Sequence, residues 1–482
     1  MNTTMSTSDD RLAARIRRAD FGTWRDKVTA VRGCARPIHL TGSTTILATP
    51  QANPFPLSPT TKAQALAHRS GHIFVPCGTR RASVCPACAD RYAADAFHLM
   101  HSGLAGDEGK GVPATVTEKP RQFVTLTAPS FGTVHGRRTS RRGRQIPCPC
   151  GEFHHPDDPR LGTAIDPDTY DYEGAVLWQA HAGALWHRFV ITLRRHLARA
   201  GHLSEAAFGA QVRISYAKVA EYQRRGLVHF HAVIRIDGPD GAHDPAPKWV
   251  AHDLVAESVR SAAAAVLVES WRPCGTVLPL VWGSQVDVRE IRPDRAGQFE
   301  DEAGQVSETK LAGYIAKYAT KSTGSTVDGI DRRLLSQAAI DMLTGITEHH
   351  RRMIQTAWDL GGLEMYNDPK DGLKLRRWAH MLGFRGHFLT KSRRYSTTFR
   401  EIRHAQAAFR RTETLAALGI EDDEGYEYTG LDGSKVYVTP TALVVNAWNF
   451  VSVGYDSDEE RQLAAAIAEG LRSANSPTHE GR

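Results

Sequence analysis

Two histidines separated by one residue, His229 and His231, follow a glycine-containing turn in this 482-residue chain. The surrounding segment reads VAEYQRRGLVHFHAVIRI and predicts a β-hairpin, with one strand ending near Glu221 and Gly226 in the turn. Because successive side chains of a strand point to opposite faces, the two histidines share one face, and apolar residues such as Phe230 share the other. Glu221 lies across the turn from both imidazoles. Two imidazoles and one carboxylate leave open positions on a divalent ion, as a catalytic metal site requires, although two ordinary histidines are the simpler alternative.

A second candidate group lies downstream, in a predicted helix over residues 309–322 that reads TKLAGYIAKYATKS. Tyr314 and Tyr318 are four residues apart and so share a helix face, and Lys317 and Lys321 each follow a tyrosine by three residues. A phenol, with a pKa near ~10, is a poor nucleophile at neutral pH. A neighbouring lysine and a metal-bound phosphate would stabilise the phenolate and the developing charge. Ordinary helix packing is the alternative for these tyrosines taken alone.

The cysteines predict a structural zinc site. Their number, seven, is odd, and the N-terminus has no apolar signal region, so a disulfide framework is not expected. The spacing Cys-x2-Cys suits a tetrahedral zinc ion, and a later Cys-x-Cys pair is the obvious candidate to complete the site. The expected ligands are Cys77, Cys85, Cys88, Cys148 and Cys150, and His154 could replace one of them. Cys34 stands alone as a possible extra ligand, and free buried thiols are the alternative.

The charge distribution favours nucleic acid as a partner. The net charge is +7, and residues 372–400 hold eight Lys or Arg and no acidic residue, with interleaved aromatics suited to phosphate contacts and base stacking. The candidate DNA-binding residues are Arg376, Arg377, Arg385, Lys391, Arg393 and Arg394. A second basic cluster spans residues 137–144. A solvated surface is the alternative for these basic segments.

Other classes of function are disfavoured by the sequence. There is no phosphate-binding Gly-x4-Gly-Lys-[Ser/Thr] loop, so no ATP is expected. No run of about 18 apolar residues occurs, so we expect no membrane association and a cytoplasmic protein.

The element order predicts an α+β fold with a central antiparallel sheet and helices mainly on one face. A helical pattern over residues 9–30 precedes a Thr-, Pro- and Ser-rich loop over 41–61, and the core strands are expected at 121–129, 212–219, 227–236 and 278–291. We divide the chain into an N-terminal helix and loops (1–70), a zinc module with the first core strand (71–160), a core region with the histidine hairpin and the tyrosine helix (161–325), a helical basic DNA-binding segment (326–405) and a C-terminal accessory region (406–482).

In combination these motifs resemble the HUH endonucleases, here through His229-Phe230-His231. More closely, the chain is similar to the RepSA-type initiators of rolling-circle plasmid replication. The similarity is carried by CGTRRASVCPAC from Cys77, FVTLTAPSF from Phe123, KVAEYQRRG from Lys218, GYIAKYATKS from Gly313 and WAHMLGFRGH from Trp378.

The resemblance implies that the protein binds a double-strand origin and nicks one strand with Tyr314 or Tyr318, leaving a 5′-phosphotyrosine and a 3′-OH that primes host DNA polymerase. It also implies a second transesterification that closes the displaced circle, a host helicase, and Mg²⁺ or Mn²⁺ held by His229, His231 and Glu221, with Gln223 as an alternative third ligand. A transposase or relaxase with the same chemistry, and a zinc-containing DNA-binding regulator without catalysis, are the alternatives.

Overall fold

The computed structural model describes residues 8–48, 65–140, 142–292, 306–307, 311–313, 333–370, 372–417, 427–429, 435–437 and 442–475. The chain forms two compact units, one from residues 1–92 and 400–482 and the other from residues 93–399. Among the described helices, none combines the length and apolar character that crossing a membrane requires.

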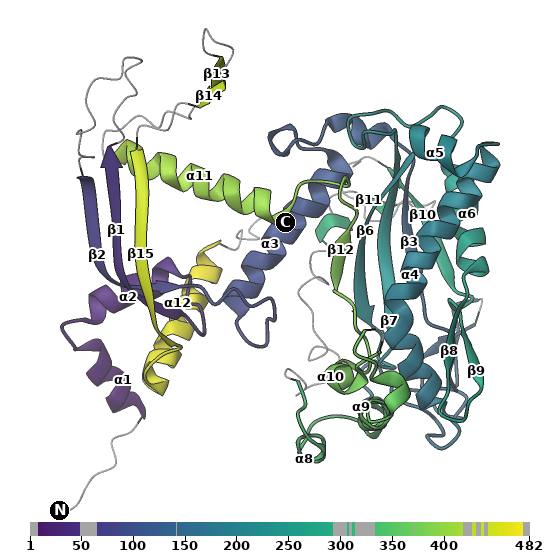
Figure 1. The fold of residues 1–482 in the computed structure, drawn as a ribbon. Coiled ribbons are helices and arrows are strands. Elements are labelled where there is room, and N and C mark those ends of the chain that lie inside the picture. The colour runs from purple at the N-terminus through teal and green to yellow at the C-terminus, as the bar shows by residue number, and fades with distance from the viewer. Residues whose placement is uncertain are drawn as a thin grey trace, which may run out of the picture. The chain divides into compact units, whose positions relative to one another are not determined.

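A six-stranded sheet organises the unit of residues 93–399 (Figure 1). Its strand order is β11 (Val306–Ser307), β10 (Val286–Arg292), β3 (Arg121–Leu126), β7 (Val228–Asp237), β6 (Arg213–Tyr222) and β12 (Leu389–Lys391). The pairings are antiparallel except for the parallel pair β10–β11. The expected α+β class with an antiparallel sheet is therefore confirmed.

Helices α4 (Tyr172–Ala200) and α6 (His252–Ala265) cover one face of this sheet and form the main core with it. Helix α4 begins at Asp171, whose side chain accepts a hydrogen bond from the Gly174 backbone N at 2.9 Å. Its apolar residues recur at helical spacing and are completely buried, as the sequence predicts (Leu185, Phe189, Leu193, Leu197). Apolar burial thus holds the helical layer on the sheet.

Shorter elements surround this core. They are α5 (Glu205–Gln211), α8 (Gln337–Asp341), α9 (Glu348–Leu360), α10 (Leu375–Trp378), the 3-10 turns η1 (Glu108–Lys110), η2 (Ala114–Glu118), η4 (Glu364–Tyr366) and η5 (Ala379–Met381), and the two-stranded pairs β4 (Arg138–Thr139)–β5 (Gln145–Ile146) and β8 (Val268–Trp271)–β9 (Val277–Leu280). The segment 326–405, expected to be helical, also contributes β12, which hydrogen-bonds to β6 as an edge strand.

The opposite sheet face carries a buried polar network. Arg121 and Arg235 are completely buried and donate to the carbonyl oxygens of Leu104 and Gly103, in helix α3 (Pro86–Ala105). Arg235 also donates two hydrogen bonds to Asp237, at 2.8 and 3.0 Å. Both guanidinium groups thus donate to several acceptors, as burial of a charge requires, although Arg121 Nε has no hydrogen-bond partner among the described residues. Helices therefore lie on both faces, rather than mainly on one.

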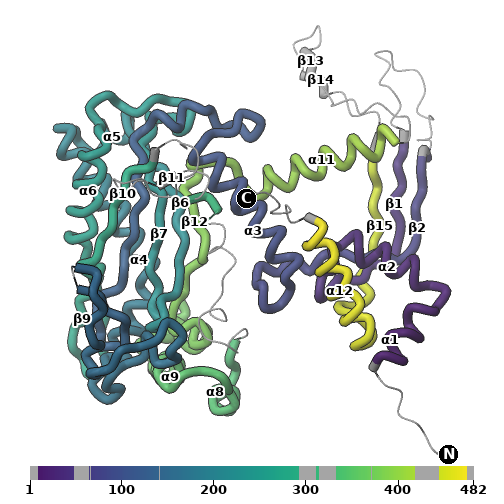
Figure 2. The backbone as a smooth tube through the Cα atoms, turned by 180° about the vertical axis from the view of Figure 1, so that it is seen from behind, coloured from purple at the N-terminus to yellow at the C-terminus, as the bar shows by residue number. Residues whose placement is uncertain are grey.

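The other unit joins the two ends of the chain. Its three-stranded antiparallel sheet has the order β15 (Ala442–Val453), β1 (Ile38–Ala48), β2 (Ala65–Val75), shown from opposite sides in Figures 1 and 2. The remaining elements are α1 (Ser8–Ile16), α2 (Phe21–Ala30), α11 (Phe399–Ala417), α12 (Asp458–Asn475) and the pair β13 (Glu427–Thr429)–β14 (Lys435–Tyr437). The regions 1–70 and 406–482, which the sequence suggested were separate, thus share one sheet.

The expected loop from residue 41 is in part a strand. Residues 38–48 read IHLTGSTTILA and form β1, paired on both sides. Threonine and isoleucine favour extended backbone, and the sequence analysis gave the Thr and Ser content too much weight as a loop signal.

Lys218 is an unusual component of the core. It lies on the helix-covered face of β6, with its Nζ 3.7 Å from the centroid of the Phe230 ring. Burial lowers the pKa of Lys218 to about 7. Protonation of this side chain therefore opposes folding.

We predict that Lys218→Met raises the melting temperature at pH 7 and that this advantage shrinks toward pH 10. The unfolded chain keeps its lysine proton up to pH ~10.4, whereas the folded wild type releases it above about pH 7. Wild-type stability therefore gains up to ~1.4 kcal/mol per pH unit in that window, a gain that the variant lacks. Thermal unfolding of both proteins at several pH values measures the gap. Lys248→Met, at an exposed position, is the control, and a gap independent of pH would contradict the prediction.

Candidate functional site

Three metal-ligating side chains converge on the β6–β7 hairpin. The strand register places Glu221 directly opposite His229, with His231 two residues further along the same face. The Nε2 atoms of the two histidines are 3.1 Å apart, and Glu221 Oε2 lies 3.1 Å from His229 Nε2 and 3.3 Å from His231 Nε2. The side chains of Glu221 and His229 are each 17% exposed, and that of His231 is 7% exposed.

The spacing of these atoms fits one shared divalent ion. With metal–ligand bonds of about 2.1 Å, neighbouring ligands lie about 3.0 Å apart in an octahedron and about 3.4 Å apart in a tetrahedron. The three separations, 3.1 to 3.3 Å, fall within that interval. Imidazole nitrogen and carboxylate oxygen are both donors that Mn²⁺ and Mg²⁺ accept in protein sites. Three protein ligands would leave positions for a substrate oxygen.

Residues around the histidines fix their orientation and charge. Thr125 of β3 is paired with His231, and its Oγ1 lies 3.0 Å from His231 Nδ1, so Nε2 faces the other two ligands. The Phe123 ring stacks on the His231 ring at 5.6 Å. Burial lowers the pKa of His231, despite the hydrogen bond to the Glu221 carboxylate, which opposes this shift. Burial alone would raise the pKa of Glu221, but its hydrogen bonds with the two histidines bring it to about 2. A neutral imidazole and an ionised carboxylate are the forms that bind metal.

The turn between the two strands is tightly packed. Gly226 has φ +73°, and a Cβ at this position would lie 2.8 Å from Met353 Sδ and 2.9 Å from Leu382 Cδ1, so only glycine fits without displacement. Gln223 Oε1 accepts a hydrogen bond from Arg225 Nε at 2.8 Å. Glu221, rather than Gln223, therefore faces the histidines.

The candidate nucleophiles lie outside the described residues. This applies to Tyr314, Tyr318, Lys317 and Lys321. The helical residues directly before them, 311–313, are described, and Leu311 and Ala312 are completely buried. Residues 311–313 are helical and lie within the range 309–322 in which the sequence predicts a helix.

Four cysteines gather in the unit that contains both chain ends. The sulfur atoms of Cys34, Cys77, Cys85 and Cys88 all lie within 4.8 Å of one another. Three Sγ–Sγ distances are 3.6, 3.7 and 3.6 Å, close to the ~3.8 Å expected for thiolates at ~2.3 Å from a tetrahedral zinc ion. Hydrogen bonds with Cys34 and Cys88 lower the pKa of Cys85. This group could bind a metal such as zinc.

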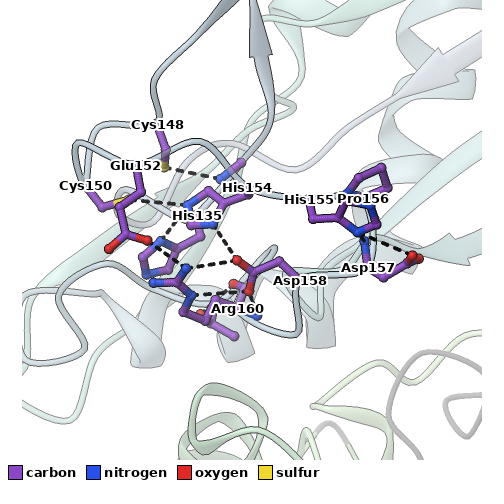
Figure 3. Close-up of polar contacts among 12 residues, drawn as sticks. His135, Cys148, Cys150, Glu152, His154, His155, Pro156, Asp157, Asp158 and Arg160 are labelled. Atoms are coloured by element: carbon purple, nitrogen blue, oxygen red, sulfur yellow. Dashed lines mark hydrogen bonds and ion pairs between the residues drawn. The ribbon is translucent and has the colours of Figure 1, made fainter.

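The other two expected zinc ligands belong to a different group. Cys148 and Cys150 lie with His135 and His154, again with one ligand atom from each residue within 4.8 Å of the others (Figure 3). The single five-cysteine site expected from the sequence is therefore corrected to two groups of four. Cys34 completes the first group, and His154 joins the second. The sequence analysis missed His135, because twelve residues separate it from Cys148 and no local motif marks it.

The basic segment 372–400 is irregular and only partly free to bind a ligand. Arg376, Arg377, Arg385, Arg393 and Arg394 are exposed. Arg376 lies over the Trp358 ring at 4.9 Å, and Arg394 pairs with Asp240 at 3.1 Å. Lys391 is half-buried and donates to the backbone oxygen of Ser396 at 2.9 Å. Arg377 also lies over a ring, that of Trp378 at 5.3 Å, but unlike Arg376 it donates no side-chain hydrogen bond to a described residue. Arg377, Arg385 and Arg393 are thus the better placed candidates for phosphate contacts.

Comparison with known proteins identifies the family. The family model described as "RepSA: Replication initiator protein, pSAM2" matches residues 20–469. A curated "Replication initiator protein" from Streptomyces ambofaciens is 40% identical over 462 residues, which cover 94% of this chain and 91% of that protein. No solved structure matches the chain. A match over almost the whole sequence, in agreement with the motifs described above, leads to one conclusion: this chain belongs to the RepSA family of replication initiator proteins.

Proposed function

We propose that this protein initiates rolling-circle replication of a plasmid by nicking one DNA strand at a double-strand origin. The observation that carries the proposal is the convergence of Glu221, His229 and His231 on one face of the sheet, with ligand atoms 3.1 to 3.3 Å apart. Family membership supports the initiator role, and the Tyr-x3-Tyr segment supplies the nucleophile that strand transfer needs. In this proposal the sheet is of the HUH type.

Glu221, His229 and His231 would hold Mg²⁺ or Mn²⁺, which would act as a Lewis acid on the scissile phosphate. Glu221 would bind the ion as a carboxylate and would offset part of its charge. Thr125 holds His231 in the orientation in which Nε2 faces the site, since its hydroxyl engages Nδ1 at 3.0 Å. The rigid β6–β7 pairing fixes all three ligands before substrate arrives.

Tyr314 or Tyr318 would act as the nucleophile. The phenolate oxygen forms a bond to phosphorus, the bond from phosphorus to the 3′-oxygen breaks, and the phenolic proton passes to solvent. The products are a 5′-phosphotyrosine and a 3′-OH that primes host polymerase. Lys317 and Lys321 would stabilise the phenolate and the developing charge. The second tyrosine would cut the regenerated site while the first still holds the old end, and the released 3′-OH would then rejoin the circle.

Other parts of the chain would bind DNA or stabilise the fold. Cys34, Cys77, Cys85 and Cys88 would bind a structural zinc ion, because a site of four thiolates is closed to substrate. Arg377, Arg385 and Arg393 would contact the phosphates of the origin, and a host helicase would unwind the duplex. A transposase or relaxase would share the nicking chemistry, whereas a regulator would bind DNA without cutting it.

Replacement of both tyrosines tests the nucleophile. We expect Tyr314→Phe with Tyr318→Phe to abolish covalent attachment to a nicked 5′ end while DNA binding persists, because phenylalanine has no hydroxyl. The assay combines purified protein and Mg²⁺ with supercoiled plasmid carrying the origin, and detects nicked plasmid and DNA-linked protein. The single variants assign the roles. Wild-type rates in both single variants mean either tyrosine suffices, and nicking by the double variant excludes this mechanism.

Thr125→Val tests the metal-site geometry. We expect it to raise the Mn²⁺ concentration needed for half-maximal nicking by about 10–100-fold, because His231 loses the group that orients it. Thr127→Val is a matched control just beyond the end of the same strand, since that hydroxyl donates to the Gln285 carbonyl instead. An equal Mn²⁺ requirement in the Thr125 variant and wild type would remove Thr125 from this role.

A third test decides between the two candidate third ligands. Glu221→Ala should lower the nicking rate by at least about 100-fold, because the metal loses its only anionic protein ligand. Gln223→Ala should leave the rate within a few-fold of wild type, since Gln223 contacts Arg225 rather than the histidines. The reverse ranking of the two variants would assign the ligand position to Gln223.

A further inference from the structure

We propose that His135, Cys148, Cys150 and His154 bind a second structural zinc ion, which fixes the base of a basic β-hairpin that contacts DNA phosphates. The hairpin comprises residues 137–140 and 142–146, which include β4 and β5. The proposed zinc site depends only on the geometry of its four ligands, whereas the proposed contact with DNA rests on the proposed function.

The ligand atoms have the spacing of a tetrahedral site. His135 Nδ1 and His154 Nε2 are 3.2 Å apart, and Cys150 Sγ lies 3.3 Å from the same His154 nitrogen. With Zn–N bonds of about 2.0–2.1 Å and Zn–S bonds of about 2.3 Å, the expected separations are about 3.3 Å and about 3.5 Å. Cys148 and His154 are buried, at 3% and 3% exposure, and two sulfurs with two imidazoles are a common structural donor set.

A carboxylate supports the proposed ligand His154 from behind. Asp158 Oδ2 lies 2.7 Å from His154 Nδ1, which leaves Nε2 directed at the other three ligands (Figure 3). Arg160 in turn donates to Asp158 at 3.0 Å and to Glu152 at 2.7 Å. An imidazole whose second nitrogen engages a carboxylate is the usual outer shell of a zinc-bound histidine.

The hairpin needs such a fixed base. Strands β4 and β5 pair through only two residues each, and an isolated two-stranded hairpin is marginally stable in water. Little apolar surface is available to hold it, and Phe153 beside the proposed site is 60% exposed. His135 precedes β4 and Cys148 follows β5, so one ion bound to both would close the hairpin at its base.

The described arginines of this hairpin are free to bind a ligand. Arg137, Arg138, Arg142 and Arg144 are exposed, and among the described residues their guanidinium groups have no hydrogen-bonding or ion-pair partner. Gly143 closes the turn with φ +75°. Unpaired guanidiniums on a fixed β-ribbon suit the phosphate backbone of DNA, which arginine recognises with two parallel hydrogen bonds.

The loop that follows His154 contacts the turn of the β6–β7 hairpin. Arg224 in that turn donates to the Pro156 carbonyl at 2.8 Å, and a Cβ on Gly162 would lie 2.5 Å from the Arg224 backbone. A hollow of about 270 Å³ lies between the two segments, lined in part by His135, Arg137 and Arg224. The base of the hairpin, at His135 and Arg137, thus lies beside the turn between β6 and β7, the strands that carry Glu221 and His229.

Metal analysis tests the zinc site. The full chain with His229→Ala and His231→Ala, which removes the candidate catalytic metal site, should contain two zinc ions per molecule. Adding Cys148→Ser should leave one, adding Cys88→Ser should also leave one, and adding both should leave none. Cys274→Ser, at an exposed cysteine outside both groups, should leave two. Two zinc ions in the Cys148→Ser protein, or one in the parent that only Cys88→Ser removes, would overturn the second site.

Asp158→Asn covers the case in which Cys148→Ser does not fold. It keeps all four ligands and weakens only the support of His154, so the zinc affinity of this site should fall by about 10–100-fold. Competition with a chromogenic chelator measures zinc release, and one of the two ions should be released at a lower chelator concentration from the variant than from the parent. Release indistinguishable from the parent would argue against zinc at His154.

DNA binding tests the role of the hairpin. Arg142→Ala with Arg144→Ala should weaken binding to origin DNA by about 10-fold or more and lower the slope of log K against log salt by about 2, with both zinc ions retained. Arg188→Ala with Arg199→Ala removes two exposed arginines from α4 and is the matched control. Equal losses in the two double variants would overturn the phosphate-contact role. Absence of DNA binding by the wild type would instead refute the proposed function and leave the zinc result intact.

Discussion

The strand register of the β6–β7 hairpin is the constraint on which the candidate site depends. Glu221 meets His229 only because Tyr222 pairs with Val228 across a turn closed by Gly226. A slip of one residue would move one strand's ligands to the apolar face. The turn is held from outside by Met353 and Leu382, which leave no room for a Cβ at position 226. Packing remote from the ligands therefore determines whether they meet.

The two faces of strand β7 differ in polarity. The face with Phe230 and Ile234 is apolar and packs under α4, with Lys218 from the neighbouring strand as the exception. The other face is polar along nearly its whole length, and a single residue, Val233, separates the candidate metal ligands from the network around Arg235. Buried arginines that donate to Asp237 and to backbone carbonyls occupy one end of this face, and the ligand group occupies the other end.

The sequence predicted the parts of the fold that depend on local periodicity. Alternation in residues 227–236 and the apolar spacing in α4 identified the central strand and its covering helix, because each is visible within a short window. The grouping of the cysteines was not predictable in this way. Cys34 and His135 join their groups through tertiary structure, and nothing in their neighbouring residues marks them as ligands. The burial of Arg121 and Arg235 was equally invisible, since charged residues are usually exposed.

The pairing of β1 with β15 has a consequence for how the protein is made. Strand β1 (residues 38–48) pairs with β15 (residues 442–453), so one of its two edges stays unpaired until the ribosome has synthesised residue 453. The three-stranded sheet therefore cannot be completed early in synthesis. The unit of residues 93–399 is contiguous and can fold while synthesis continues. A chain whose synthesis stops after residue 399 would therefore contain the folded unit of residues 93–399 but lack strand β15 of the terminal sheet.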